Sequence, residues 1–341
     1  MPFPLPPPAL RPAPDLPPPR PMARPRHRGL TRRRPGTLLL LLLLALCASL
    51  PARALTVFAC EPEWAALTRM LLPTATVHIA THAGQDPHRI EVRPALVEQL
   101  RSADLAVCTG AGLEAGWLPA LQQRAGNARV QDGAPGMFHA ADQVTLIDTR
   151  AATRGPVAGD LHPRGNPHVQ TDPQRLLLVA AALARRLQPL VGQEGAAVAQ
   201  RLAAFETRWR QRIDDWQRRA AGLPGRRIAV QHDTFGYLWA WLGLVPVVDL
   251  EPMPGLAPTP GSMQQLLETL RREPPLAMVV VVPYQDARPA RWLASQIGRP
   301  AGGGVPVLTL PASPAEPLAP QALETWFEQL MRPLLLVAAA R

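Results

Sequence analysis

The chain has 341 residues, of which 47% are hydrophobic and 18% charged, a composition that excludes a disordered or fibrous protein. All 36 basic residues are arginines, and nine of them fall in residues 1–54 together with one acid, Asp15. The other 287 residues carry 27 arginines and 25 acidic residues, a net charge of +2. The overall charge of +10 therefore belongs mostly to the N-terminal segment and gives no support to nucleic-acid binding.

Residues 1–54 have the pattern of a secretory signal peptide with an extended Pro- and Arg-rich leader. The basic cluster Arg32-Arg33-Arg34 precedes a leucine-rich run, Thr37–Leu50, and Ala52-Arg53-Ala54 places small residues before a cleavage site. The apolar run is short for a membrane anchor. We therefore predict export to the periplasm with cleavage after Ala54, and either Met1 or Met22 is the true start.

The exported part is predicted to be an α/β protein with two Rossmann-like lobes. Short apolar runs without alternation are typical of parallel strands that are covered on both faces, and helical patterns separate them. We predict an N-terminal lobe over residues 55–172 and a C-terminal lobe over residues 226–341. The predicted strands are Leu55–Cys60, Thr76–Ala80, Asp104–Cys108, Arg227–Gln231, Val245–Asp249, Ala277–Val282 and Val305–Leu310.

Residues 173–225 are predicted to form a helical linker between the lobes. A helix is expected over about Pro173–Leu187, and a second, longer one follows it. The second helix is indicated by apolar residues at spacings of three and four, namely Val198, Leu202, Phe205, Trp209, Ile213 and Trp216. A long helical spine of this kind predicts a stiff connection between the lobes.

Cys60 and Cys108 each end a predicted strand. In an exported protein they could form a disulfide if the two strands are neighbours. Two buried free thiols are the alternative, and the sequence does not decide between them.

Three histidines stand in loops where a ligand could bind. His88 and His168 each follow a proline, and His232 comes directly after the predicted strand Arg227–Gln231. In open α/β sheets, ligands collect beyond the carboxyl ends of the strands. Imidazole nitrogen suits zinc and other late first-row metal ions. The alternative is that each is an ordinary surface or hydrogen-bonded loop residue.

Taken together, these motifs resemble the zinc/manganese solute-binding proteins of metal ABC importers, the ZnuA/TroA-like family of cluster A-I. The resemblance extends over essentially all of residues 55–341. It rests on Gln85-Asp86-Pro87-His88 with Pro94, Ala103-Asp104-Leu105 before Thr109-Gly110-Ala111-Gly112-Leu113-Glu114, Asn166-Pro167-His168 with Thr171-Asp172-Pro173, and His232 with Phe235-Gly236-Tyr237.

The resemblance implies a metal site in the cleft between two lobes, with His88, His168 and His232 as ligands. It implies a monomeric carrier, not an enzyme, that captures Zn²⁺ as cargo and delivers it to a permease with a cytoplasmic ATPase. Manganese is the less favoured metal, because it prefers more oxygen ligands.

The chain departs from the family pattern at the fourth ligand. Many relatives supply an aspartate after the last strand, where this chain has no aspartate in Leu310–Glu316. Asp286, just beyond the predicted strand Ala277–Val282, is our first candidate for the fourth ligand, Glu61 the second and a water molecule the third. The His- and acid-rich loop of some zinc-specific relatives is also missing, and His162 is either an accessory ligand or a surface residue.

Two other functions are compatible with the sequence. A binding protein of the same fold could hold a metal chelate or another organic ligand. A zinc-dependent enzyme would need an open coordination position and a general base, for which Asp86 and Asp233 are the candidates. The sequence has no GxSxG or HExxH motif, so nothing favours a serine hydrolase or a zinc protease.

Overall fold

The computed structural model describes residues 54–148, 162, 164–251, 256–298 and 304–339. The predicted signal peptide lies outside these residues, apart from Ala54. Within the described part of the chain, no helix has both the length and the apolar character that a membrane crossing requires.

The N-terminal lobe is built on a parallel four-stranded sheet with the order β2-β1-β3-β4. The inner strand β3 is apolar and fully buried, as a strand covered on both faces must be. The strands are β1 (Thr56–Ala59), β2 (Thr76–Ile79), β3 (Leu105–Cys108) and β4 (Met137–His139), and the lobe's helices are α2 (Pro62–Leu71), α3 (Pro94–Ser102) and α4 (Leu118–Ala125). The edge strand β4 was not predicted from the sequence, because three residues give almost no periodic signal.

The C-terminal lobe repeats this arrangement with the strand order β6-β5-β7-β8, again entirely parallel. In both sheets the first strand in sequence pairs with the second and the third, and the fourth lies at the edge. The strands are β5 (Arg227–Val230), β6 (Val245–Asp249), β7 (Met278–Val281) and β8 (Val307–Thr309), and the helices are α7 (Gly236–Leu242), α8 (Pro260–Leu270) and α9 (Arg288–Gln296). The predicted fold of two parallel-sheet α/β lobes is confirmed.

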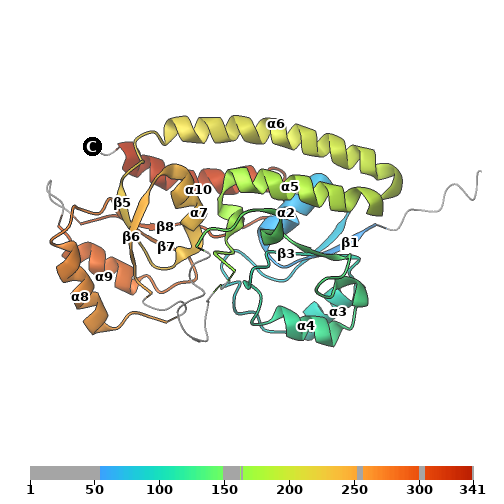
Figure 1. The fold of residues 1–341 in the computed structure, drawn as a ribbon, viewed down its shortest axis with the longest axis horizontal. Helices are drawn as coiled ribbons and strands as arrows, with labels where there is room; N and C mark the ends of the chain where they lie inside the picture. The colour runs from blue at the N-terminus through green and yellow to red at the C-terminus, as the bar shows by residue number, and fades with distance from the viewer. Residues whose placement is uncertain (1–53, 149–161, 163, 252–255, 299–303, 340–341) are drawn as a thin grey trace, which may run out of the picture. The chain divides into compact units, whose positions relative to one another are not determined.

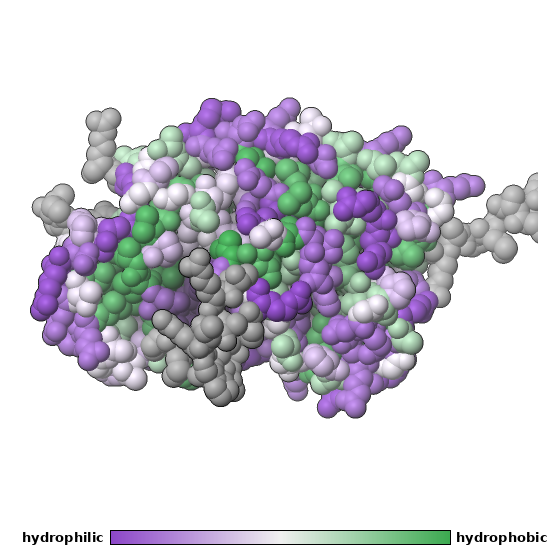
Figure 2. Space-filling view, in the orientation of Figure 1, coloured by the Kyte–Doolittle hydropathy of each residue, from purple (hydrophilic) through white to green (hydrophobic). Residues whose placement is uncertain are grey.

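Between the two sheets, the chain forms the helices α5 (Pro173–Leu187) and α6 (Gly195–Arg219), and α10 (Ala322–Ala339) packs against α6 at the end of the chain. Asp172 begins α5 by accepting hydrogen bonds from the amides of Gln174 and Arg175. Over 25 residues α6 extends about 37 Å, and it runs alongside α5 and α10 in Figure 1. Its predicted apolar stripe is buried except for Leu202, which is half-buried, and the surface over this helix in Figure 2 is mostly hydrophilic. Short 3-10 turns lie at Ala128–Val130, Ala141–Gln143, Val169–Thr171, Gln188–Leu190, Gly192–Glu194 and Asp233–Phe235.

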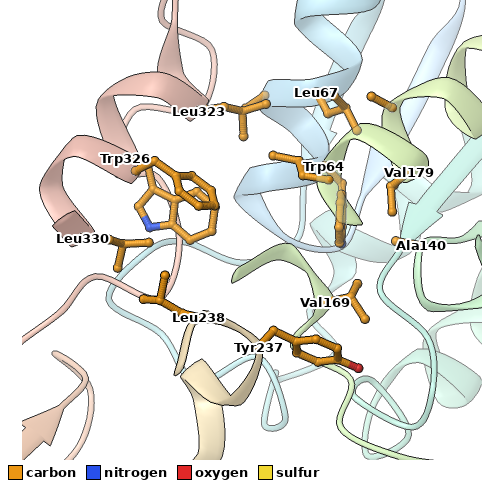
Figure 3. Packing of buried hydrophobic residues seen from close by; sticks show 14 of the residues in the cluster. Trp64, Leu67, Ala140, Val169, Val179, Tyr237, Leu238, Leu323, Trp326 and Leu330 are labelled. Carbon is orange, nitrogen blue, oxygen red and sulfur yellow. The ribbon is translucent and has the colours of Figure 1, made fainter. Parts of the chain in front are cut away.

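One hydrophobic core runs through both lobes and the helices between them. Its buried residues come from both sheets and from α2, α5, α6, α7 and α10, whereas the outer face of each sheet is covered by one smaller cluster of its own. In the upper part of Figure 3, Leu323 and Trp326 of α10 lie on the left and Trp64 and Leu67 of α2 to their right, with Leu238 of α7 below them. Because this core crosses the boundary between the lobes, moving one lobe against the other would expose apolar surface.

Cys60 and Cys108 are joined by a disulfide, with their Cα atoms 4.8 Å apart. The bond is possible because β1 and β3 are adjacent and each cysteine lies at the carboxyl end of its strand. Of the two alternatives that the sequence left open, the structure therefore has the disulfide and not two free thiols. The bond ties two neighbouring loops together on the side of the sheet where the site lies.

Candidate metal centre

His88, His168 and His232 converge where loops of the two lobes meet. His88 lies in the loop between β2 and α3, His168 begins the 3-10 turn Val169–Thr171 before α5, and His232 follows β5. One potential ligand atom from each of the three lies within 4.8 Å of the others. Their ring centroids are 5.5–5.7 Å apart, with the rings close to perpendicular to one another. The sequence separates these residues by 80 and 64 positions, so only the folded chain brings them together.

The His88 ring is oriented by its own loop. Asp86 Oδ1 accepts hydrogen bonds from the His88 amide at 3.0 Å and from His88 Nδ1 at 2.8 Å. Burial would raise the pKa of Asp86, but the hydrogen bonds from His88 outweigh it and hold the pKa below its ordinary value. Trp117 Nε1 donates to the carbonyl of Pro87, and a Cβ at Gly116 would lie only 2.9 Å from the His88 carbonyl oxygen. With Nδ1 occupied by a carboxylate, Nε2 is the nitrogen that can bind a metal.

His168 is the most deeply buried of the three, with 2% of its surface exposed. Its amide donates to Asn166 Oδ1 and its carbonyl accepts from Thr171 Oγ1, but neither ring nitrogen has a hydrogen-bond partner within the described part of the chain. Burial, followed by the neighbouring imidazoles, lowers the pKa of His168 well below its usual value. The ring is therefore neutral near pH 7 and has a lone pair available for a metal ion.

His232 is held from behind by a carboxylate, as His88 is. His232 Nδ1 lies 3.1 Å from Glu251 Oε2, and these two side chains are only 10% and 13% exposed. Glu251 follows β6, and its amide donates to Asp249 Oδ1. This places a second carboxylate–histidine pair at the centre, with Nε2 of His232 facing the shared space.

Asn166 connects the His168 loop to the segment that follows His232. Its Nδ2 donates to the backbone carbonyl and to Oδ2 of Asp233, both at 2.9 Å, and its own carbonyl accepts from the Tyr237 hydroxyl at 2.6 Å. A Cβ at Gly236 would lie 2.7 Å from Asp233 Oδ1, so only glycine allows this close approach. Burial is the main cause that raises the pKa of Asp233 to about 7. These contacts fix the relative positions of two of the three imidazoles.

The two carboxylates expected at the fourth position have other partners. Asp286 is exposed and binds Arg288, whose Nε lies 2.9 and 2.8 Å from the two carboxylate oxygens and holds the Asp286 pKa down to about 2. Glu61 is buried, and its Oε2 accepts hydrogen bonds from the amide and hydroxyl of Thr109. Burial, then the charge of Glu114, raises the pKa of Glu61 well above its usual value. Neither carboxylate belongs to the group of ligand atoms formed by the three histidines.

Asp286 does, however, line the same cavity as two of the histidines. The cavity has a volume of about 210 Å³ and is also lined by Asp86, His88, His232 and Glu251. Asp286 therefore lies at the wall of the site with its carboxylate paired to Arg288.

His162 lies beside the three histidines. Its Nε2 is 3.2 Å from His88 Nε2, and its ring centroid is 5.2 Å from that of His88. Burial, followed by the charges of His88 and His232, lowers the pKa of His162 to about 3. The sequence leaves the role of His162 open and assigns no role to Glu251. The available signal was that Glu251 follows a strand adjacent to the one that presents His232.

Comparisons with known proteins match this architecture. A model of the family described as zinc-uptake complex component A, periplasmic (ZnuA) matches residues 57–335. A crystal structure of ZnuA superimposes with a TM-score of 0.67 at 21% identity, covering 84% of this chain and 98% of that one. FpvC from Pseudomonas aeruginosa, a solute-binding protein solved with Mn²⁺, gives 0.65 at 19% identity and covers 84% and 98%.

A manganese-bound mutant of a periplasmic metal-binding protein from Candidatus Liberibacter asiaticus gives a TM-score of 0.62 at 18% identity, covering 82% of this chain and 97% of that one. At such identities these structures establish the fold alone. A search of curated proteins found no match. The family model spans most of the chain, however, and the protein therefore belongs to the ZnuA family of periplasmic zinc-uptake components.

Proposed function

We propose that this protein is a periplasmic carrier that captures Zn²⁺ through His88, His168 and His232 and delivers it to an ABC permease with its ATPase. The observation that carries the proposal is the convergence of the three imidazoles within 4.8 Å, one of them buried with both ring nitrogens unpartnered in the described part of the chain. A buried polar ring without partners is costly, and a bound cation would remove that cost.

The preference for zinc rests on the donor atoms. Neutral imidazoles suit zinc and other late first-row ions, whereas manganese favours oxygen donors. Structures similar in fold are described with different metals: a zinc-bound ZnuA deletion mutant, FpvC with Mn²⁺ or Ni²⁺, and a Cd-bound periplasmic protein. The fold is thus compatible with several ions, and the ligands of each chain must determine the choice.

The rest of the proposal follows from the sequence and the core. The leader pattern of residues 1–54 supports export and a periplasmic location. The shared core between the lobes favours small motions, so we expect the permease to separate loops at the site or displace a ligand when the metal is released. As a member of a family of metal carriers, the chain is proposed to act as a monomer and without catalysis.

The test is metal binding by the purified exported form. We expect one Zn²⁺ per chain, detected by elemental analysis and by competition with a chelator, and a large loss of affinity in His88→Ala, His168→Ala and His232→Ala. His82→Ala is the matched control, because His82 is exposed in the same lobe as His88 and its Nδ1 accepts a local amide hydrogen bond from Gly84. Zinc affinity that is unchanged in the three site variants would refute the assignment.

A second candidate is the binding of a metal chelate or another organic ligand. It is favoured by the cavity of about 210 Å³ beside His88 and His232, which is larger than one ion needs, and by Arg89 in its wall, which suits an anionic group. Binding of free Zn²⁺ with the same affinity in the absence of any organic molecule would argue against this candidate.

A further inference from the structure

The His162 ring faces the centre with one nitrogen and away from it with the other. Nε2 lies 3.2 Å from His88 Nε2, while Nδ1 lies on the side of Gly112, where a Cβ would be 3.5 Å from it. His162 is also 6.2 Å from His168 between ring centroids. A turn in which the Gly165 amide donates to the His162 carbonyl joins it to the loop that carries His168. One loop therefore contributes two imidazoles to the same space.

The short distance between His162 and His88 has a simple chemical meaning. His88 Nδ1 is paired with Asp86, so the Nε2 of His88 presents a lone pair to His162. Two such nitrogens approach this closely only when a proton or a cation lies between them. In a tetrahedral zinc site with bonds of 2.0–2.1 Å, neighbouring ligand nitrogens are roughly 3.3 Å apart. The 3.2 Å separation thus fits two ligands of one ion.

The donors otherwise expected for the fourth position are engaged elsewhere. Asp286 pairs with Arg288, and Glu61 accepts hydrogen bonds from Thr109. Within the described residues, the group of ligand atoms that His88, His168 and His232 form within 4.8 Å of one another includes neither the Asp286 nor the Glu61 carboxylate. It also omits His162, but the Nε2 of that ring lies 3.2 Å from His88 Nε2, and its ring centroid lies 6.2 Å from that of His168.

We propose that His162 is the fourth ligand, so that the cargo ion is bound by four neutral imidazoles and no carboxylate. The inference rests on the proposed function, since it concerns the same ion. Asp86 and Glu251 would balance the charge of the metal from behind His88 and His232 rather than by ligation. An all-nitrogen donor set favours Zn²⁺, Co²⁺ and Ni²⁺ over Mn²⁺, so His162 is a residue that determines metal specificity.

The experiment compares the parent protein with His162→Ala, His162→Asp and the control His82→Ala. We expect His162→Ala to bind Zn²⁺ at least about tenfold more weakly, because even an outer partner of a ligand contributes that much. X-ray absorption on the zinc-loaded proteins should count four imidazoles in the parent and three in His162→Ala. His162→Asp should bind Mn²⁺ better than His162→Ala does, because it supplies an oxygen donor.

The outcomes separate this inference from the proposed function. If the parent binds zinc with three imidazoles and His162→Ala has the same affinity, the fourth-ligand assignment is overturned while the carrier function stands. If the parent binds no zinc, both fail. Loss of zinc affinity in His82→Ala equal to that in His162→Ala would also overturn the inference, because the effect would not be specific to the site.

Discussion

Removing the carboxylate behind His232 should weaken zinc binding without removing a ligand. In Glu251→Gln, the amide oxygen can still accept the hydrogen bond from His232 Nδ1, but the negative charge is lost. The Nδ1–Oε2 distance is 3.1 Å, and a metal bound to Nε2 lies about 4 Å from Nδ1, so the charge is within about 7 Å of the ion. At that distance a charge of −1 attracts a dication by about 1 kcal/mol in water and about 5 kcal/mol at an effective dielectric constant of 20.

The expected loss lies between these figures, about 10- to 100-fold in zinc affinity, which corresponds to roughly 1.4–2.7 kcal/mol. The assay is competition with a chelator of known zinc affinity near neutral pH. Glu268→Gln is the control, because Glu268 is an exposed glutamate on α8 of the same lobe and its replacement changes the net charge equally. A change below about twofold in Glu251→Gln, or an equal loss in the control, would refute the role given to Glu251.

Three further predictions concern stability. Tyr237→Phe removes a hydroxyl that donates to the Asn166 carbonyl and accepts from the Ile147 amide, and should lower the free energy of unfolding by about 1–3 kcal/mol in denaturant titrations; no change would refute the role of this contact. Replacing Cys60 and Cys108 together by alanine opens a loop of 48 residues and should lower the free energy of unfolding by roughly 4 kcal/mol in the same assay. The prediction fails if the oxidised parent and the variant unfold at the same denaturant concentration. Burial raises the pKa of Glu63 from 4.5 to about 7, so between these pH values the carboxyl group is ionised in the unfolded chain but still protonated in the folded one. From pH 4.5 to 7 the free energy of unfolding of the parent should therefore fall by about 3 kcal/mol relative to that of Glu63→Gln. Parallel pH profiles of the two proteins would contradict this.

Much of the fold could be predicted because buried parallel strands have short, continuous apolar sequences. Of the eight strands in the part of the chain that the structure describes, seven coincide with predicted segments, and α5 has the predicted bounds Pro173–Leu187. The exception, β4, has three residues and ends in a histidine, so neither its length nor its composition distinguishes it from a loop. The shared core could not be predicted, because an apolar stripe does not indicate which lobe will cover it.

The candidate site was predictable where the strand ends position its residues. His232 comes two residues after the last residue of β5, so its place beyond the carboxyl ends of the strands follows from the sequence. The carboxylates were less predictable, because their direction depends on neighbours that come from other elements. Asp286 turns to Arg288, and Glu61 turns to Thr109 beyond the adjacent strand β3. The ligand assignment itself stays a prediction until metal binding is measured.

The core that crosses the lobes also sets how the protein should melt. Each lobe shares its buried tryptophans and leucines with helices that also pack on the other lobe, so neither lobe has a complete core of its own. Ala54–Arg341 should therefore denature in one cooperative transition. An ion held by loops of both lobes would then raise the midpoint of that entire transition, by an increment that grows with the logarithm of the free metal concentration. The difference in transition midpoint between the metal-free and the metal-loaded chain, measured by calorimetry, would thus report the affinity of the imidazole site for the metal.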